Sequence, residues 1–210
     1  MLRDFGTSGS MKLTIPNQLT ILRIALTPFF LYFFLQDSMP QKLIGTIIFI
    51  VAAASDWYDG YVARKFNVIT RWGQFMDPLA DKILISSALI VFAYLGFLYF
   101  WMVLVIVTRD FLITFLRMYA LHLGKSIVTS QLAKWKTTFQ MSAVFILLIY
   151  LNLPDNGLYQ LETYPPPYDH WVSLLFMLVT LITAISGIQY LFENRDHIFE
   201  LFRRTVKLFQ

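Results

Sequence analysis

The chain has 210 residues, of which 57% are hydrophobic and only 14% charged, and its mean hydropathy is +0.59. Because soluble domains usually carry about 25% charged residues, this composition excludes an ordinary soluble protein. The lack of cysteine excludes disulfides, thiolate catalysis and sulfur-ligated metals. The three histidines are not paired at metal-ligand spacing, so any metal must be held by oxygen, which favours Mg²⁺, Mn²⁺ or Ca²⁺.

Six long apolar segments predict an all-α integral membrane protein with six transmembrane helices, because a helix needs about 20 apolar residues to span a bilayer. The predicted spans are Leu19–Leu35, Leu43–Ala63, Gln74–Leu95, Phe97–Leu121, Thr137–Leu153 and Trp171–Phe192. Residues 1–10 are polar and small, and we expect them to be an addition ahead of a native start at Met11. Residues 11–210 would then form one six-helix domain. We expect the phenylalanine-rich first span to face lipid.

Lysines and arginines gather between the second and third spans, between the fourth and fifth, and after the sixth. The loop 152–170 on the other side carries acids and no lysine or arginine. By the positive-inside rule, both termini are predicted to be cytoplasmic. We attribute the net charge of +4 to this topology, with some attraction of the tail to anionic lipid, and not to nucleic acid. We expect a multi-pass protein of a bacterial cytoplasmic (inner) membrane.

Four aspartates lie where carboxylates are least favourable. Asp56 and Asp59 close one apolar run, and Asp77 and Asp81 open the next. Residues three or four apart share one face of a helix, so the members of each pair point the same way. A charge at membrane depth costs several kcal/mol unless it is paired, hydrated or bound to a metal. The two pairs could therefore hold two divalent cations, as two-metal sites do for displacement at phosphorus.

Residues beside the aspartates suit a phosphate ligand. Gly60 and Gly73 lack side chains, which lets a ligand approach closely, and Arg64 could meet a phosphate in bidentate geometry. One alternative is that the aspartates form ion pairs with Arg64, Arg71 and Lys82 at a wet helix boundary. Another is a divalent-cation transporter that uses the carboxylates for permeation. Against transport, the acids gather on one side of the membrane and no broken helix marks the other half.

The complete pattern D-x2-D-G-x2-A-R-x8-G-x3-D-x3-D, from Asp56 to Asp81, resembles the signature of the CDP-alcohol phosphotransferase family. Members transfer a phosphatidyl-type group from a CDP-linked lipid to an alcohol and release CMP. The resemblance implies that family's fold, two Mg²⁺ ions per site with Mn²⁺ as the alternative, and a homodimer. It implies that Asp56, Asp59, Asp77 and Asp81 bind metal and that Asp81 is also the base that deprotonates the acceptor. The residues expected to contact the CDP-lipid are Asn17, Thr20, Gly60, Arg64, Thr70 and Gly73. One base without an evident nucleophile favours direct displacement.

Cations further along the chain concern the acceptor alcohol. Arg109 and Arg117 lie inside the fourth predicted span, where an arginine is costly and usually functional. Lys134 and Lys136 precede the fifth span. If these cations converge beside the aspartates, they suit an acceptor that already carries a phosphate. The alternatives are that Asp110 or the aspartate cluster neutralises Arg109, and that the lysines serve topology alone.

The same region, together with the segment from Pro16 to Arg23, resembles the phosphatidylglycerophosphate synthase branch of the family. This resemblance implies transfer of a phosphatidyl group from CDP-diacylglycerol to glycerol 3-phosphate at a site that faces the cytoplasm. The products would be phosphatidylglycerophosphate and CMP, as in phospholipid biosynthesis. Another acceptor, such as an inositol phosphate, remains the alternative.

Overall fold

The structure is a computed structural model that describes residues 15–66, 71–122, 131–153 and 165–195. These residues form six α-helices and no β-strand. The helices are α1 (Ile15–Phe34), α2 (Met39–Phe66), α3 (Arg71–Tyr94), α4 (Phe100–His122), α5 (Gln131–Leu151) and α6 (Trp171–Glu193). The predicted all-α fold is confirmed at this level, because each helix overlaps one predicted span.

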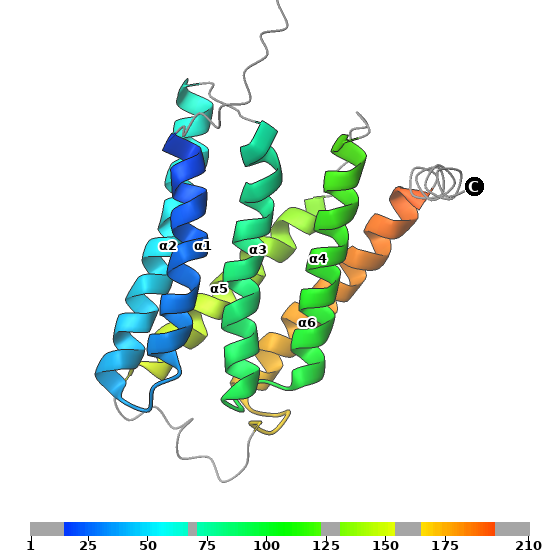
Figure 1. The fold of residues 1–210 in the computed structure, drawn as a ribbon. Coiled ribbons are helices and arrows are strands. Elements are labelled where there is room, and N and C mark those ends of the chain that lie inside the picture. The colour runs from blue at the N-terminus through cyan, green and yellow to red at the C-terminus, as the bar shows by residue number, and fades with distance from the viewer. Residues whose placement is uncertain (1–14, 67–70, 123–130, 154–164, 196–210) are drawn as a thin grey trace, which may run out of the picture.

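Successive helices run in opposite directions (Figure 1). One side of the bundle, at the top of Figure 1, holds the first residues of α1, α3 and α5. The last residues of α2, α4 and α6 lie on the same side. We call this end the motif end. α1 packs against α2 and α3, α4 contacts α3 and α6, and α5 contacts α6 and α3. Gly45 allows α2 to approach α1 closely, since a Cβ atom there would lie 2.9 Å from the backbone nitrogen of Phe34.

One described helix, α6, is long and apolar enough to cross a membrane by length and composition. Shorter apolar stretches occupy Gln18–Phe34, Met39–Ser55 and Trp135–Leu151. Six membrane crossings and the orientation of the termini therefore stay predictions.

Aromatic side chains hold the first three helices together. Phe30 and Phe34 of α1 are fully buried. The ring centroid of Phe30 lies 5.2 Å from that of Phe49 in α2, and the Phe34 centroid lies 6.0 Å from that of Phe92 in α3. Such aromatic pairs add about 0.5–1.5 kcal/mol beyond area burial. The expectation that the phenylalanines of the first span face lipid is thus wrong for these two residues, although Phe29 is 57% exposed.

The end of α3 explains why the fourth helix starts later than predicted. Gly96 has φ 81°, in the left-handed region that favours glycine. Its N–H donates to the carbonyl of Ala93 at 3.1 Å, and the N–H of Phe97 donates to the carbonyl of Phe92 at 2.8 Å. These two bonds make a Schellman motif, and the Phe97 ring packs into the core. α4 therefore begins at Phe100 and not at Phe97.

The start of α5 is a second correction. The helix begins at Gln131 and not at Thr137, so Lys134 and Lys136 lie within it and not in the preceding loop. Lys136 is fully buried, and its ammonium group pairs with Asp110 of α4. A role in topology alone does not fit Lys136, because the side chain belongs to the interior of the bundle.

Candidate active site

α2 and α3 bring the predicted metal ligands to the motif end. Asp56 and Asp59 lie on α2, Asp77 and Asp81 lie on α3, and the two helices are in contact. Asp77 and Asp81 are one helical turn apart and both are half-buried. Carboxylate oxygens are the donors that Mg²⁺ and Mn²⁺ prefer, so this set of residues fits such an ion.

A hydrogen bond connects α1 to these aspartates. The hydroxyl of Thr20, which is fully buried, donates to carboxylate oxygen Oδ1 of Asp77. Hydrogen bonds from neighbouring groups orient the carboxylates that hold metals. A residue predicted to contact the CDP-lipid thus touches, and orients, a residue predicted to bind metal.

Several predicted site residues fall outside the described side chains. The structure places these on helices by their backbone only: Asn17, Asp56, Asp59, Gly60, Arg64, Gly73 and Lys134. Thr70 lies outside the described residues altogether. Among the side chains that are described, no three acids or histidines gather into a metal-binding group, but only two of the four aspartates belong to them. The two-ion site and the CDP contacts therefore stay predictions.

A second set of charged side chains lies in the interior, around Asp110 of α4. Lys82 of α3 places its Nζ atom 3.4 Å from Oδ2 of Asp110, and Arg109 donates from Nη1 to Oδ1 at 3.1 Å. Lys136 of α5 also donates to Oδ1. We call these four residues the Asp110 cluster. The Asp110 side chain is 2% exposed and that of Lys136 is 0% exposed, whereas Lys82 and Arg109 each retain 13%.

The Asp110 cluster carries more positive than negative charge. Three cations surround one carboxylate, so the cluster has a formal excess of two positive charges. Taking ions out of water is costly, and attraction between partners offsets this cost only where the charges are well matched. An anion with two negative charges, such as a phosphate monoester, would balance this excess. The more exposed members, Lys82 and Arg109, are the ones that such an anion could reach.

Arg117, the second predicted arginine, lies further along α4. It is eight residues from Arg109, a little more than two turns, so both arginines lie on a similar side of the helix. The fully buried hydroxyl-bearing side chain of Tyr190, from α6, interacts electrostatically with Arg117. Both arginines therefore lie on the part of α4 that packs against α6.

The structure shows which of the ion pairs predicted for Arg109 and Lys82 are formed. The predicted alternative that Asp110 neutralises Arg109 is confirmed as a contact, while a role in binding an acceptor phosphate stays a prediction. Lys82, which the sequence placed in a possible ion pair with the motif aspartates, pairs with Asp110. The sequence analysis did not assign a central role to Asp110. The signal was available, because a carboxylate inside an apolar segment is costly at Asp110 for the same reason as at the four motif aspartates.

Charged side chains buried among apolar helices are rare and usually functional, and the described helices contain two such groups: the aspartates at the motif end and the Asp110 cluster. The model of the CDP-alcohol phosphatidyltransferase family matches residues 13–186, so the chain belongs to this family. The family predicted from the aspartate pattern is thereby confirmed.

The chain is also similar to individual curated proteins. It is 38% identical over 192 residues to the CDP-diacylglycerol–glycerol-3-phosphate 3-phosphatidyltransferase of Bacillus subtilis (strain 168), which covers 86% of this chain and 94% of that protein. It is 40% identical over 187 residues to the protein of the same name from Haemophilus influenzae, covering 86% of this chain and 93% of that protein. A third protein of this name, from Sodalis glossinidius, is 34% identical over 195 residues, with 90% of this chain and 100% of that protein covered.

Proposed function

We propose that the chain transfers a phosphatidyl group from CDP-diacylglycerol to glycerol 3-phosphate, giving phosphatidylglycerophosphate and CMP. The observation that carries this proposal is the similarity, over 86% of the chain, to relatives that bear the name of this activity. The excess positive charge of the Asp110 cluster supports it independently, because glycerol 3-phosphate is an acceptor with a phosphate of its own. Membership in a transferase family disfavours the cation transporter.

Four carboxylates would hold the metal: Asp56, Asp59, Asp77 and Asp81. Two Mg²⁺ ions, with Mn²⁺ as the alternative, would neutralise the diphosphate of the CDP-lipid and polarise the phosphorus under attack. The hydrogen bond from Thr20 to Asp77 supports this assignment, because carboxylates that hold metals are themselves usually oriented by such a bond. Contacts to the CDP-lipid are assigned to Asn17, Gly60, Arg64, Thr70 and Gly73. Thr20, which the sequence also assigned to this ligand, is fully buried, so we assign it the orientation of Asp77 and not a direct contact.

Asp81 serves as the base in this proposal. It takes the proton from a hydroxyl group of glycerol 3-phosphate, and the resulting oxygen nucleophile bonds directly to the phosphorus of the phosphatidyl group. The bond between that phosphorus and the CMP oxygen breaks, and CMP leaves with the electron pair. Lys82 follows Asp81 in α3 and belongs to the Asp110 cluster, so one helix links the base to the cations that would hold the acceptor phosphate.

The acceptor phosphate is assigned to Arg109, Arg117, Lys134 and Lys136, and the structure adds Lys82 as a candidate. Lys136 is fully buried, so it acts by holding Asp110 and by its positive field, whereas Lys82 and Arg109 retain exposed surface for direct contact. This division explains how several cations contribute when only some touch the ligand.

The motif end is proposed to face the cytoplasm, with six helices crossing the inner membrane and both termini on the cytoplasmic side. The alternation of helix directions supports this arrangement, because it brings the starts of α1, α3 and α5 and the ends of α2, α4 and α6 to one end (Figure 1). Water-soluble glycerol 3-phosphate and Mg²⁺ could reach the aspartates from there. A homodimer is proposed from the family resemblance alone.

The proposed function is tested with purified protein, Mg²⁺, CDP-diacylglycerol and labelled glycerol 3-phosphate. Label should appear in lipid, and CMP should be released in equal amount. Serine, inositol and an inositol phosphate serve as competing acceptors. Release of CMP with one of these and not with glycerol 3-phosphate would show that the acceptor is wrong.

Removal of divalent metal with EDTA is expected to lower CMP release at least about 100-fold, because metal catalysis contributes several kcal/mol and each 1.4 kcal/mol is tenfold. Addition of excess Mg²⁺ or Mn²⁺ should restore the rate, and addition of Na⁺ at matched ionic strength should not. Full turnover in the chelator would exclude the metal site.

A further inference from the structure

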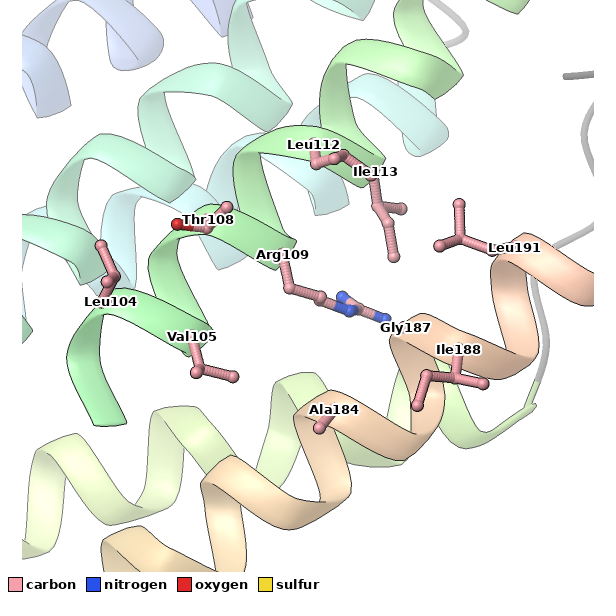
Figure 2. Close-up of a pocket in the computed structure, with 10 residues that line it drawn as sticks. All are labelled: Leu104, Val105, Thr108, Arg109, Leu112, Ile113, Ala184, Gly187, Ile188 and Leu191. Carbon is pink, nitrogen blue, oxygen red and sulfur yellow. The ribbon is translucent and has the colours of Figure 1, made fainter. Parts of the chain in front are cut away.

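We infer that Ser186 and Gly187 of α6 are positioning residues that hold the Arg109 guanidinium in place for the acceptor phosphate. This inference rests on the proposed function. α6 lies outside the aspartate motif, and no residue on it was assigned a role from the sequence. Its contacts with α4 nevertheless surround the side chain of Arg109 (Figure 2).

Ser186 provides the hydrogen-bond acceptor. Nη2 of Arg109 donates to Oγ of Ser186 at 2.8 Å. The same Oγ donates its own proton to the carbonyl of Thr183 at 3.2 Å, which leaves its lone pairs directed to the arginine. Ser186 is 0% exposed, so it has no surface with which to touch a substrate. Its effect on the reaction must pass through Arg109.

Gly187 provides the space. A Cβ atom on Gly187 would lie 3.0 Å from Cγ of Arg109 and 3.6 Å from its Nε. Arg109 cannot easily move aside, because Asp110 holds its Nη1 and Ser186 holds its Nη2. Figure 2 shows the side chain reaching from α4 toward Gly187. A Cβ atom at position 187 would therefore require the Arg109 side chain to shift by a few tenths of an ångström, against the hold of its two partners.

The surroundings of Arg109 offer its guanidinium few other contacts, which increases the effect of Ser186 and Gly187 on its position. Its side chain lies in a groove of about 450 Å³ between α4 and α6, and the other lining residues are almost all apolar (Figure 2). Apart from the Thr108 hydroxyl, the lining of this groove offers the guanidinium no other side-chain acceptor, so its position depends chiefly on Asp110 and Ser186. Within the described part of the chain, the buried Nε of Arg109 has no hydrogen-bond partner. That Nε atom is buried, so an incoming phosphate would be bound through the 13% of the Arg109 side chain that stays exposed.

The test measures full steady-state kinetics for Ser186→Ala in the full-length protein. We expect KM for glycerol 3-phosphate to rise about tenfold, since a hydrogen bond to a charged group is lost and a tenfold change corresponds to 1.4 kcal/mol. KM for CDP-diacylglycerol and kcat should stay near the wild-type values, because only acceptor binding depends on Arg109. Ser186→Thr keeps a hydroxyl and should restore most of the acceptor affinity. Thr180→Ala is the matched control, because Thr180 is a buried hydroxyl of α6 that, among the described residues, donates to the Phe176 carbonyl of its own helix and does not contact Arg109 by a hydrogen bond.

Gly187→Ala is expected to raise the same KM, and the Arg109→Ala background decides whether either residue acts through Arg109. Without the arginine there is no guanidinium to hold and no Cγ to displace, so Ser186→Ala and Gly187→Ala should then add no further loss of kcat/KM for glycerol 3-phosphate. If Gly187→Ala does not accumulate as folded protein, the Ser186 variants carry the test.

Three results would overturn the inference or its basis, and they are distinguishable. An unchanged acceptor KM in both single variants would refute the positioning role while wild-type transfer to glycerol 3-phosphate stands. Equal losses with and without Arg109 would show a general packing defect of α6. No transfer to glycerol 3-phosphate by the wild-type protein would refute the proposed function itself, before any variant is compared.

Discussion

Asp81→Asn is expected to lower kcat by about 10²–10⁴-fold, the usual contribution of a positioned general base. The amide has nearly the shape of the carboxylate but cannot accept the proton of the acceptor hydroxyl. Binding of CDP-diacylglycerol should survive, because Asp56, Asp59 and Asp77 remain. CMP release under single-turnover conditions measures the first effect, and a direct binding assay with the CDP-lipid measures the second.

The Asp81 prediction needs two controls, because Asp81 is also a proposed metal ligand. The loss should persist at saturating Mg²⁺, which separates the loss of a base from weaker metal binding. Asp37→Asn makes the same chemical change at an exposed aspartate in the turn between α1 and α2 and should be neutral. Unchanged turnover in Asp81→Asn would remove this residue from the role of base.

Asp110→Ala is expected to destabilise the protein by about 3–5 kcal/mol, the usual cost of removing one partner of a buried ion pair. The carboxylate is 2% exposed and contacts three cations, which would then repel one another without compensation. The free energy of unfolding, measured by denaturant titration in detergent micelles, checks this value. KM for glycerol 3-phosphate should rise as well, because Arg109 loses its Nη1 partner.

A double variant separates stability from binding in the Asp110 cluster. Replacing Asp110 with Leu and Lys136 with Met removes a buried cation together with its carboxylate, and such apolar replacements are often neutral or stabilising. We therefore expect much of the stability to return while acceptor binding stays weak. If Asp110→Ala unfolds at the same denaturant concentration as the wild type, the ion pairs do not stabilise the bundle.

The spacing of the aspartates could be interpreted from the sequence because the relevant geometry is local. Residues separated by three or four positions share a face in any helix, so Asp77 and Asp81 could be paired without knowledge of the fold. The family match confirms the membership predicted from that pattern. The roles of the individual aspartates stay predictions, since local geometry does not say which oxygens meet a ligand.

The helix ends were predicted less well, for two physical reasons. At Gly96 a left-handed residue turns the chain and folds Phe97 into the core. From the sequence alone, this apolar residue looks like the start of the next span, although it belongs to the turn. The pair of charges at Lys134 and Lys136 favours a loop when only the sequence is considered. Lys136 is accommodated inside a helix because its counterion, Asp110, lies beside it on α4. These two residues are 26 positions apart, so the sequence does not show the pairing.

The Asp110 cluster could not be assembled from the sequence, because its members come from three helices. Arg109 and Asp110 are adjacent in the sequence, so their contact can be predicted. Lys82 of α3 and Lys136 of α5 reach Asp110 only because the fold brings their side chains to it from other helices. Ser186 gave no signal at all. A serine in an apolar helix usually bonds to its own backbone, as Ser186 also does, and its second bond depends on the approach of α4.

In the proposed membrane topology, the ion pairs of Asp110 also bear on the order in which the helices enter the bilayer during translation. α4 brings its own counterion, since Arg109 and Asp110 lie side by side in one segment, and in α3 Lys82 follows Asp81 directly. α5 contains lysines and no acid, so it enters with uncompensated charge. The carboxylate that neutralises Lys136 lies on α4, which precedes α5 in the chain and is therefore synthesised first. For Asp110 and Lys136, the vectorial synthesis of the chain therefore supplies the carboxylate before the buried lysine that needs it.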